Sequence, residues 1–403
     1  MERRRVIIVG FLTILLVSSV FGQDCEWNKD TDFPENPPLL FDSSFELIRP
    51  VMEGDQRIVR VPADSSLTVA CTGTELVNLG QTAVEATCVG GHILEAEGTD
   101  WELMSLGCSD SVKETISSSL ATCGDNNIGE VHRIGFEVYD ANSFYELIQV
   151  CFEPSAETTL YTAHTLHGAN IAAKDIESSR PSFKSSHGFF SVSMSTVYTQ
   201  DSQLALMEDL LGDSDLANTI IDPDHQLYFA KGHMSPDADF VTVAEQDATY
   251  YFINALPQWQ AFNNGNWKHL EYATRDLAEA HGRDLRVYSG GYRVLSLNDI
   301  NSNPVDIYLG LTEGKEVVPA PDVTWKVVHE ESTGRAAAIV GVNNPHITSP
   351  PAPLCSDLCD QLTWIDFDIN DLAHGFTYCC TVDDLRQAVP HVPDLGNVDL
   401  LTD

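Results

Sequence analysis

Short runs of alternating apolar and polar residues fill the first third of the chain. Examples are residues 57–61, 66–71 and 92–95, with Gly and Asp between the runs. A period of two residues is typical of half-buried strands, and Gly and Asp favour the turns between them. The pattern therefore predicts a small, β-rich N-terminal region.

The middle of the chain mixes helix and strand patterns. Apolar residues recur with helical spacing in residues 203–211, 241–252 and about 265–281, with Pro257 ending the second helix and Asn263 or Asn264 capping the third. Strand-like runs lie at residues 160–166, 187–193, 226–230, 285–289, 305–309, 325–329 and 336–342. Because strands and helices do not alternate strictly, we predict an α+β fold rather than a doubly wound sheet.

The N-terminus has the pattern of a secretory signal peptide. Residues 3–5 are Arg, residues 6–17 are apolar, and Val20 and Gly22 suit a cleavage site. A retained N-terminal anchor is the alternative, which the cleavage-like site disfavours. No apolar run is long enough to span a bilayer as a helix. We therefore expect residues 1–22 to be removed and the mature protein to be secreted, extracellular and free of the membrane.

Ten cysteines fall into two groups, with none between residues 152 and 354. An even number of cysteines in a secreted chain indicates disulfides, so the six early cysteines predict up to three bridges. Adjacent cysteines rarely bond each other, so Cys379 and Cys380 are each expected to pair with one of Cys355 and Cys359. The spacing of these four also fits a zinc site, which the secreted context disfavours.

The cysteines and a Pro-rich segment divide the mature chain into three predicted parts. Residues 23–155 form a cysteine-rich, β-rich N-terminal domain, and residues 156–348 form a central domain without cysteine. Residues 349–403 begin with a stiff, Pro-rich linker and continue as a disulfide-bonded C-terminal extension. A chain of this length exceeds one ordinary core, which agrees with more than one domain.

The chain is strongly acidic, with 22 Lys and Arg against 60 Asp and Glu and a formal net charge of -38. Such a surface repels polyanions within a Debye length and disfavours tight, non-specific binding to nucleic acid. If the protein acts on nucleic acid, its few basic residues must gather at the site, together with a divalent cation.

Four residues in the second half of the chain form a candidate site. His233 suits a general base because its ordinary pKa lies near neutrality, and the carboxamide oxygen of Asn263 suits a hard cation such as Mg2+. Glu271 lies about 80° from Asn263 around a regular helix, where it can hold metal-bound water, and Arg275 can pair with it. Alone, these are an ordinary structural histidine, turn and helix pair. Together they predict one-metal phosphodiester hydrolysis.

These residues lie within longer motifs: K-G-H-M-x-P from Lys231, N-x-x-P-Q from Asn254, and F-N-x-G-x-W-x-x-L-E from Phe262, followed by Arg275. The combination resembles the DNA/RNA non-specific endonucleases of the Serratia type, whose relatives include endonuclease G. It is most similar to secreted crustacean members, a shrimp double-strand-specific DNase and a crab duplex-specific nuclease. The resemblance covers about residues 156–345. It implies a ββα-metal (His-Me finger) nuclease core between the disulfide-rich N-terminal domain and the disulfide-bonded tail.

The resemblance also implies a role for each motif residue. His233 is implied to be the general base, and Asn263 the single direct ligand of Mg2+, for which Mn2+ or Ca2+ can substitute. The residues implied to hold the hydrated ion through water are Glu271, Asn254 and Gln258. The residues implied to contact the substrate phosphate are Arg180, Lys231 and Arg275. The residues implied to be catalytic are His233, Arg180, Lys231 and Glu271.

The implied activity is hydrolysis of DNA, with a preference for duplexes and with 5′-phosphate ends; no protein partner is expected. A sugar-non-specific nuclease and an inactive extracellular binding protein are the alternatives. The inactive binding protein rests on one departure from the family pattern. Ala230 and Lys231 stand where the commoner pattern has Asp-Arg. The change removes a carboxylate and the bidentate guanidinium of an arginine. We further expect the acidic surroundings to raise the pKa of His233 and, if they outweigh Mg2+, to favour an alkaline optimum.

Overall fold

The computed structural model describes residues 22–139, 143–176, 180–185, 188–311 and 314–403. The predicted signal peptide therefore lies, apart from Gly22, outside the described residues. The strand predicted at residues 187–193 is wrong over residues 188–193, which form turns, while residue 187 lies outside the described part. No helix in the described ranges is long and apolar enough to cross a membrane.

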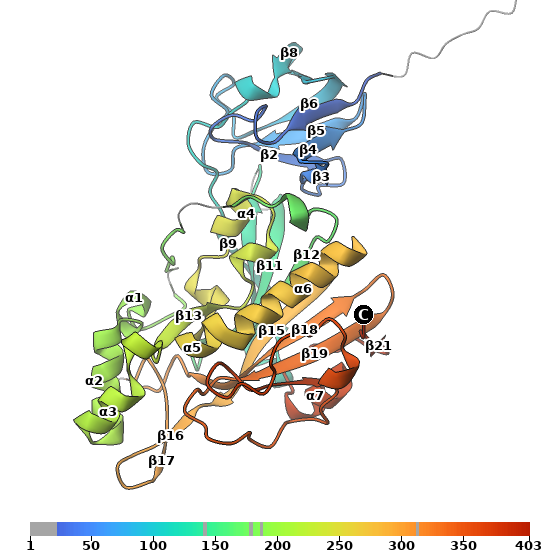
Figure 1. The fold of residues 1–403 in the computed structure, drawn as a ribbon. Helices are drawn as coiled ribbons and strands as arrows, with labels where there is room; N and C mark the ends of the chain where they lie inside the picture. Colours follow the sequence, from blue (N-terminus) through green and yellow to red (C-terminus); the bar gives the residue numbers. More distant parts are fainter. Residues whose placement is uncertain (1–21, 140–142, 177–179, 186–187, 312–313) are drawn as a thin grey trace, which may run out of the picture.

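A mixed sheet of nine strands forms the centre of the described chain (Figure 1). Its order is β20-β19-β18-β15-β12-β11-β10-β9, all antiparallel, with β21 added parallel to β19. The strands are β9 (Thr115–Cys123), β10 (Gly129–Glu137), β11 (Phe144–Glu153), β12 (Thr158–Leu166), β15 (Leu285–Val294), β18 (Pro321–Glu330), β19 (Arg335–Val342), β20 (Thr377–Cys380) and β21 (Asp399–Leu400).

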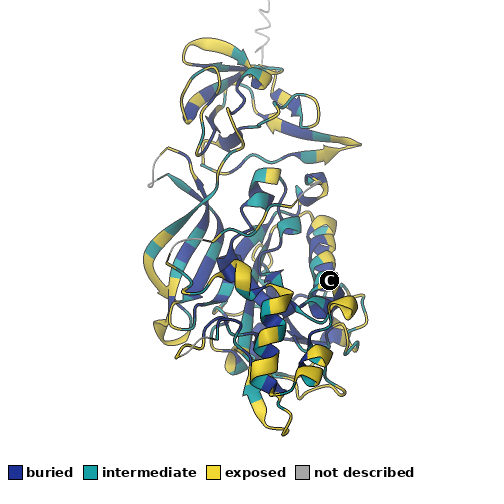
Figure 2. Cartoon of the chain, turned by 90° about the vertical axis from the view of Figure 1, so that its left-hand side faces the viewer, coloured by how far each residue is buried: buried dark blue, intermediate teal, exposed yellow. Residues whose placement is uncertain are grey.

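Successive residues of β18 and β19 point to opposite faces of this sheet, and both faces are buried. Val328 and Ile339 pack on the face that carries helix α6 (Lys268–His281). Val327 and Val340 pack on the other face with α7 (Val382–Ala388). Figure 2 shows the result, with dark blue strands inside and yellow helix surfaces outside. Strands buried on both faces read as continuous apolar runs, which explains why the sequence located them well.

The N-terminal region forms two small sheets, as the alternating pattern predicts. One has the order β1-β4-β3 and the other β2-β5-β6-β7-β8. Two disulfides, Cys25–Cys88 and Cys71–Cys108, lie in their shared core. The strands are β1 (Cys25–Asn28), β2 (Leu39–Asp42), β3 (Val51–Glu53), β4 (Gln56–Val61), β5 (Ser66–Ala70), β6 (Ala83–Gly90), β7 (Ile93–Ala96) and β8 (Thr99–Glu102).

The large sheet crosses both predicted domain boundaries. β11 and β12 are paired strands on either side of residue 155, and β20 from the C-terminal extension pairs with β19 across residue 348. The third early disulfide, Cys123–Cys151, links β9 to β11 inside this sheet. Because the prediction assigned all six early cysteines to the N-terminal domain, it placed the end of that domain at residue 155, after Cys151. We propose that the N-terminal unit ends near residue 112, before β9.

Two of the three predicted helices are present, as α2 (Gln200–Leu211) and α6, whereas the helix predicted at residues 241–252 is largely wrong. Residues 241–252 contain only α4 (Val243–Asp247) and the start of the 3-10 turn η6 (Phe252–Asn254). The predicted strand at 226–230 begins later, as β13 (Phe229–His233), and its partner β14 (Ala255–Trp259) was missed. The prediction took Pro257 as the end of a helix and so missed β14. Proline is tolerated in this strand because both strands of a two-stranded hairpin are edge strands. The remaining elements are α1 (Met194–Val197), α3 (Ser214–Ile220), β16 (Ser296–Asn298) and β17 (Pro304–Asp306).

The hairpin β13–β14, followed by α5 (Gln260–Phe262), a π-turn at Asn263–Trp267 and α6, is a ββα unit. This unit lies on the large sheet in Figure 1, with β13 and α5 close together at one end. The fold is thus α+β with a ββα core, as predicted.

The C-terminal extension is part of the same body. Its two disulfides, Cys355–Cys380 and Cys359–Cys379, confirm that each of the adjacent cysteines takes one of the earlier pair. The disulfides link the loop after the Pro-rich segment to β20. The strand β20 in turn pairs with β19 through backbone hydrogen bonds. The extension therefore adds edge strands to the large sheet.

Glu330, at the end of β18, joins several elements at one point. Its fully buried carboxylate accepts hydrogen bonds from His281 (2.7 Å), Arg283 (2.8 Å), Thr333 (2.6 Å) and Arg335 (3.3 Å). Against the cost of burial, these partners lower the pKa of Glu330 to about 2. The end of α6 and two strands thus share one buried anion.

We predict that Glu330→Gln destabilises the protein by roughly 3 kcal/mol at neutral pH, because the cationic partners lose their anion. A carboxyl with a depressed pKa stabilises the fold fully above its unfolded pKa and progressively less as pH falls towards 2. The difference from the wild type in urea unfolding should therefore be large at pH 7 and shrink at pH 3. Glu331→Gln, at the exposed neighbour, is the matched control. An equal difference at both pH values would contradict the prediction.

Candidate active site

The hairpin β13–β14 carries the predicted general base. His233 is the last residue of β13 and lies opposite Ala255. The preceding Gly232 packs against Gln258, since a Cβ at this position would stand 2.0 Å from the Oε1 atom of Gln258. A larger residue here would have to displace the buried side chain of Gln258, which gives a steric reason for Gly in the K-G-H motif. Gln258 is buried, and its Oε1 atom has no hydrogen-bond partner; its predicted contact with metal-bound water stays a prediction.

Asn254 fixes the loop that follows His233. Its Oδ1 atom accepts a hydrogen bond from the backbone of Ser235 (3.0 Å), and its Nδ2 atom donates to the carbonyls of Ser235 (2.9 Å) and Thr249 (2.8 Å). The side chain is fully buried. The observed role of Asn254 is therefore to hold the chain on both sides of the site, and the predicted role beside the metal stays untested.

The imidazole of His233 is packed between aromatic rings. The ring of Phe183 lies 4.7 Å from it, and that of Tyr250 lies 4.8 Å away and nearly perpendicular. The hydroxyl of Tyr250 donates to Asp237 (2.7 Å), which also lies 3.4 Å from Arg180. The Nε2 atom of His233 is buried and has no hydrogen-bond partner.

Burial lowers the pKa of His233 to about 4, although the nearby charge of Asp237 acts in the opposite direction. Arg180 lowers this pKa further. The expectation that acidic surroundings raise the pKa of His233 is therefore wrong, because local desolvation outweighs the one carboxylate that faces the ring. The imidazole is neutral at pH 7 and ready to accept a proton.

Asn263 lies in the π-turn that leads into α6, and it does not cap the helix. Its backbone is helical (φ -60°, ψ -40°), and α6 has no side-chain cap. The predicted capping role of Asn263 or Asn264 is therefore wrong. The side chain of Asn263 is half-buried and makes no hydrogen bond with the described residues. Its carboxamide oxygen is thus available to a ligand.

The C-terminal extension packs directly against this π-turn. A Cβ on Gly265 would stand 2.5 Å from the carbonyl oxygen of His374, so the turn requires glycine here. The backbone N–H of Asn266 donates to that carbonyl (2.9 Å), and its side chain donates to the carbonyls of Asp368 and Gly375 (both 2.8 Å). The C-terminal extension therefore holds the segment that carries Asn263.

Glu271 lies one turn into α6 and is half-buried, and its carboxyl group makes no hydrogen bond or ion pair with the described residues. Burial raises its pKa to about 7; Lys326 and Arg275 oppose the rise, while Asp239 and Asp237 add to it. Because Asp237 acts on both His233 and Glu271, the base and this carboxylate belong to one electrostatic cluster.

The helical spacing predicts that Arg275 pairs with Glu271. In the structure Arg275 forms its ion pair with Asp239 instead. Its guanidinium donates to Asp239 (2.8 Å) and lies over the ring of Tyr272. His164 on β12 contacts the other carboxylate oxygen of Asp239 (3.0 Å). The loop after His233 therefore supplies the anion that Arg275 uses, because α6 runs back alongside this loop.

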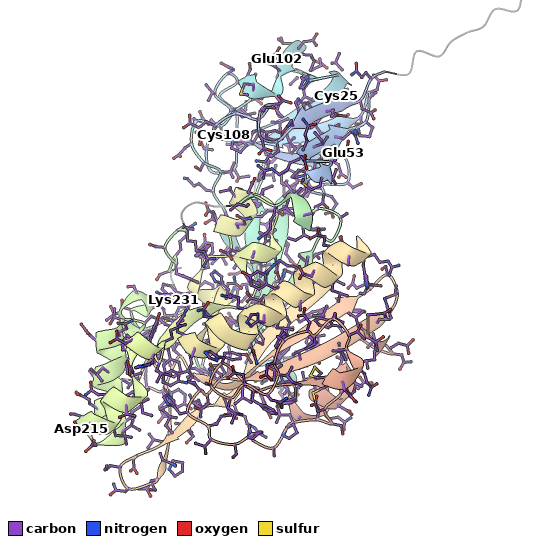
Figure 3. All side chains as sticks on the ribbon, viewed as in Figure 1. Cys25, Glu53, Glu102, Cys108, Asp215 and Lys231 are labelled. Carbon is purple, nitrogen blue, oxygen red and sulfur yellow. A yellow bond between two sulfur atoms is a disulfide. The ribbon has the colours of Figure 1, made fainter. Side chains whose placement is uncertain are left out.

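Arg180 and Lys231 lie at the edge of the cluster. The side chain of Arg180 is 74% exposed, so it can reach a substrate. The Nζ atom of Lys231, a residue labelled in Figure 3, lies over the rings of Phe183 and Tyr198, 5.8 and 5.5 Å from their centroids. Burial lowers the pKa of Lys231. Their contact with phosphate stays a prediction.

Comparison with known proteins gives the family of this site. The sequence profile described as DNA/RNA non-specific endonuclease matches residues 127–385, well over half of the chain. The chain belongs to this family. The family predicted from the motifs is thus confirmed, and the match extends beyond the predicted range at both ends.

Relatives of this endonuclease include salivary proteins of insects. It is 27% identical to a salivary endonuclease of Lutzomyia longipalpis over 87% of this chain and 81% of the relative. It is 22% identical to salivary protein Tsal1 of Glossina morsitans morsitans over 97% and 98% of the two chains. A chain of the EndoG/EndoGI complex aligns with a TM-score of 0.35 and 17% identity, covering 52% of this chain and 79% of that chain; a likeness this weak does not bear on the assignment.

The residues of the endonuclease site suit a hydrated divalent cation. Mg2+ prefers oxygen ligands and keeps most of its water. Asn263 and Glu271 both present oxygen atoms that hydrogen-bond to no residue of the described chain. Because burial raises the pKa of Glu271, a divalent cation beside it would favour the ionised carboxylate. Asn263 can bind such an ion directly, and Glu271 can hold its water.

Sequence reasoning missed several charged residues of this cluster. Asp237 and Asp239 follow His233 at four and six positions, and Lys326 reaches the cluster from β18, fully buried. The Nζ atom of Lys326 lies 3.1 Å from the hydroxyl of Ser289 and 5.4 Å from the ring of Trp267. A lysine in an apolar strand was the available signal, since a buried charge needs a reason.

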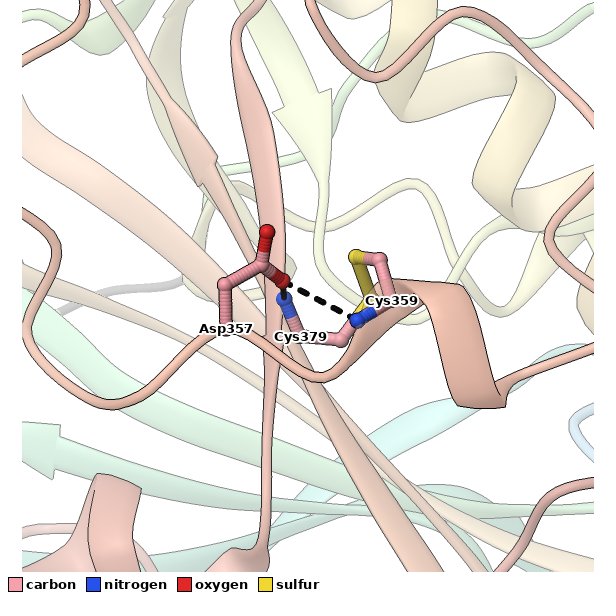
Figure 4. Close-up of side chains that lie close together, drawn as sticks. All are labelled: Asp357, Cys359 and Cys379. Atoms are coloured by element: carbon pink, nitrogen blue, oxygen red, sulfur yellow. Dashed lines mark hydrogen bonds between the residues drawn. A yellow bond between two sulfur atoms is a disulfide. The ribbon is translucent and has the colours of Figure 1, made fainter.

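A second group with metal-ligating atoms has a purely structural explanation. Asp357, Cys359 and Cys379 converge, but the two cysteines form a disulfide (Figure 4). The Oδ1 atom of Asp357 accepts hydrogen bonds from both cysteine backbones (3.0 Å each). The zinc alternative for the late cysteines is therefore excluded.

We predict that metal binding sets the acid limb of the pH profile. Glu271, with a pKa of about 7, is protonated below that pH, and a bound cation must displace its proton. Raising Mg2+ from limiting to saturating should therefore move the acid limb of kcat/KM from near pH 7 towards the pKa of His233, about 4. In Glu271→Gln this movement should disappear. A limb that stays at one pH in the wild type would contradict the prediction.

Proposed function

We propose that this protein is a secreted, Mg2+-dependent endonuclease that hydrolyses DNA, prefers duplexes and leaves 5′-phosphate ends. One observation carries the proposal: His233, which is neutral at pH 7, shares an electrostatic cluster with the carboxyl group of Glu271 through Asp237. Asn263, on the π-turn that leads into the same helix, presents a carboxamide oxygen that bonds to none of the described residues. Membership of the DNA/RNA non-specific endonuclease family supports the reaction class and a divalent metal. The duplex preference rests on the resemblance of the motifs.

In the proposed mechanism His233 takes a proton from the attacking water. Phe183 and Tyr250 hold the imidazole in place, and Asp237 stabilises the positive charge that the ring gains. The attack breaks the bond from phosphorus to the 3′ oxygen. The phosphate therefore stays on the 5′ oxygen of one product, and the other product ends in a 3′-hydroxyl. A Mg2+ ion held by Asn263 and, through water, by Glu271 would neutralise charge on the phosphate and the leaving oxygen.

Arg180, Lys231 and Arg275 are proposed to contact the scissile phosphate. Arg180 is exposed and can move to the substrate, whereas Arg275 is held by Asp239 and offers its remaining N–H groups. Because the whole chain carries a net charge of -38, this local group of cations is needed to attract a polyanion.

Secretion has support from two sources. The first 22 residues have the pattern of a signal peptide, and five disulfides require an oxidising compartment. Relatives from Lutzomyia longipalpis and Culex quinquefasciatus are named salivary endonucleases.

A sugar-non-specific nuclease is the second candidate, and the family description, which includes RNA, favours it. Competition between duplex DNA and RNA substrates separates the two activities. An inactive binding protein is disfavoured by the intact site residues, although Ala230 removes a carboxylate at the hairpin. Plasmid nicking that is abolished by EDTA supports the nuclease. A plasmid that stays intact at saturating Mg2+ contradicts the proposed nuclease activity.

His233→Ala should lower kcat for plasmid cleavage by about 10^2- to 10^4-fold, because a general base contributes that factor. Its unfolding transition should remain cooperative and close to that of the wild type. His225→Ala is the matched control, since His225 lies in an exposed turn and pairs with Asp222. Activity in His233→Ala near the wild-type level would reject the assigned base.

Asn263→Ala should weaken the apparent affinity for Mg2+ by about 10- to 100-fold or more while leaving the affinity for DNA in EDTA unchanged. The neighbouring Asn264→Ala is the control, because the side chain of Asn264 is exposed and bonds to Gln226 and Lys268. Titration of activity with Mg2+ measures the difference. Equal Mg2+ dependence in both variants would show that Asn263 does not bind the ion.

A further inference from the structure

Lys174 lies beside the active site on a segment that two parts of the molecule hold. It directly follows the 3-10 turn η3 (Ile171–Ala173), which packs against α6 on one side and against β3 of the N-terminal region on the other. Its backbone N–H donates to the carbonyl of Ile171 (3.2 Å). The backbone position of Lys174 is therefore fixed relative to α6.

The ammonium group of Lys174 is half-buried and makes no hydrogen bond or ion pair with the described residues. Burial lowers its pKa; the charges that act on it are Arg275, Asp237, Asp239 and Arg180. These four belong to the cluster around His233 and Glu271. A partly desolvated cation without a contacting anion suits a phosphate that arrives from outside.

Asp175, the next residue, anchors this segment to both neighbours. From the N-terminal region, Arg57 on β4 donates to its carboxylate, and Lys29 lies 3.6 Å away. From the loop after the active site, Val243 donates its backbone N–H to the same carboxylate (3.0 Å). The side chain of Gln246 donates to the Asp175 carbonyl (3.0 Å).

A second ion pair links the N-terminal region to the same place. Arg49 pairs with Glu245 on α4 at 2.7 Å, and both side chains are almost fully buried. Glu245 also closes the capping box of α4 with Thr242. The N-terminal region therefore contacts the segment that carries Lys174, residues 170–175, and also the segment 241–247 that bonds to it.

We propose that Lys174 is a further phosphate-binding residue of this site, contacting a backbone phosphate next to the scissile one, and that the N-terminal region positions it through Arg57 and Asp175. The proposal rests on the nuclease function proposed above. It assigns the N-terminal unit a role in substrate binding, although that unit contributes no residue to the reacting group.

The first experiment measures KM for duplex DNA in Lys174→Ala between 50 and 200 mM NaCl at fixed Mg2+. Losing one phosphate contact lowers the slope of log KM against log salt by about 0.9, so the increase in KM over this range should shrink about threefold. kcat should change little, and Lys174→Arg should restore the slope. An unchanged slope in Lys174→Ala overturns the assignment.

The second experiment tests the positioning role. Arg57→Ala should raise KM and lower the salt slope as Lys174→Ala does, and the double variant should be no worse than Lys174→Ala alone. Arg60→Ala is the matched control on the same strand, because its partners Glu26 and Glu53 lie within the N-terminal sheet. Additive effects of Arg57→Ala and Lys174→Ala, or an equal effect of Arg60→Ala, overturn the positioning role. A wild type without Mg2+-dependent cleavage would instead reject the proposed function itself.

Discussion

The site depends on one buried carboxylate, Asp239. It accepts a hydrogen bond from Arg275 on α6 and contacts His164 on β12, and all three side chains are buried. These contacts, together with the local charges, hold the pKa of Asp239 far below its ordinary value. The loop after His233, helix α6 and the large sheet therefore meet at one anion. Removing it would leave a buried arginine unpaired, which is costly.

Desolvation acts in opposite directions on the two titratable groups at the centre. It lowers the pKa of His233 to about 4 and raises that of Glu271 to about 7. Each shift favours the uncharged form, because burial penalises charge of either sign. For the histidine the result is a base that is free at neutral pH. For the glutamate it is a carboxyl group that is partly protonated near pH 7.

The candidate site is also held by the N-terminal region and by the C-terminal extension. The C-terminal extension braces the π-turn of Asn263 through Asn266, and the N-terminal region braces the opposite side through Asp175 and Glu245. Disulfides stabilise both braces, in the cores of the N-terminal sheets and beside β20. These contacts fix the positions of the few basic residues at the candidate site of a very acidic protein.

Local patterns in the sequence were sufficient for the family, the α+β class, the disulfides of the tail and the residues of the motifs. These follow from fixed spacings and residue types, such as Gly232 before His233, which a local reading detects. The strands β15, β18 and β19 were also found, because burial on both faces leaves a continuous apolar run. The hairpin strand β14 was missed, since Pro257 interrupts a pattern that only its partner β13 explains.

Only the tertiary structure decided which charges meet. Arg275 lies four residues from Glu271, yet it pairs with Asp239, because α6 runs back along a loop that is distant in sequence. The direction of the His233 pKa shift likewise depends on the rings of Phe183 and Tyr250, not on the net charge of the chain. Electrostatic energies are set by distance and desolvation in three dimensions, and neither is written in the spacing of residues along one chain.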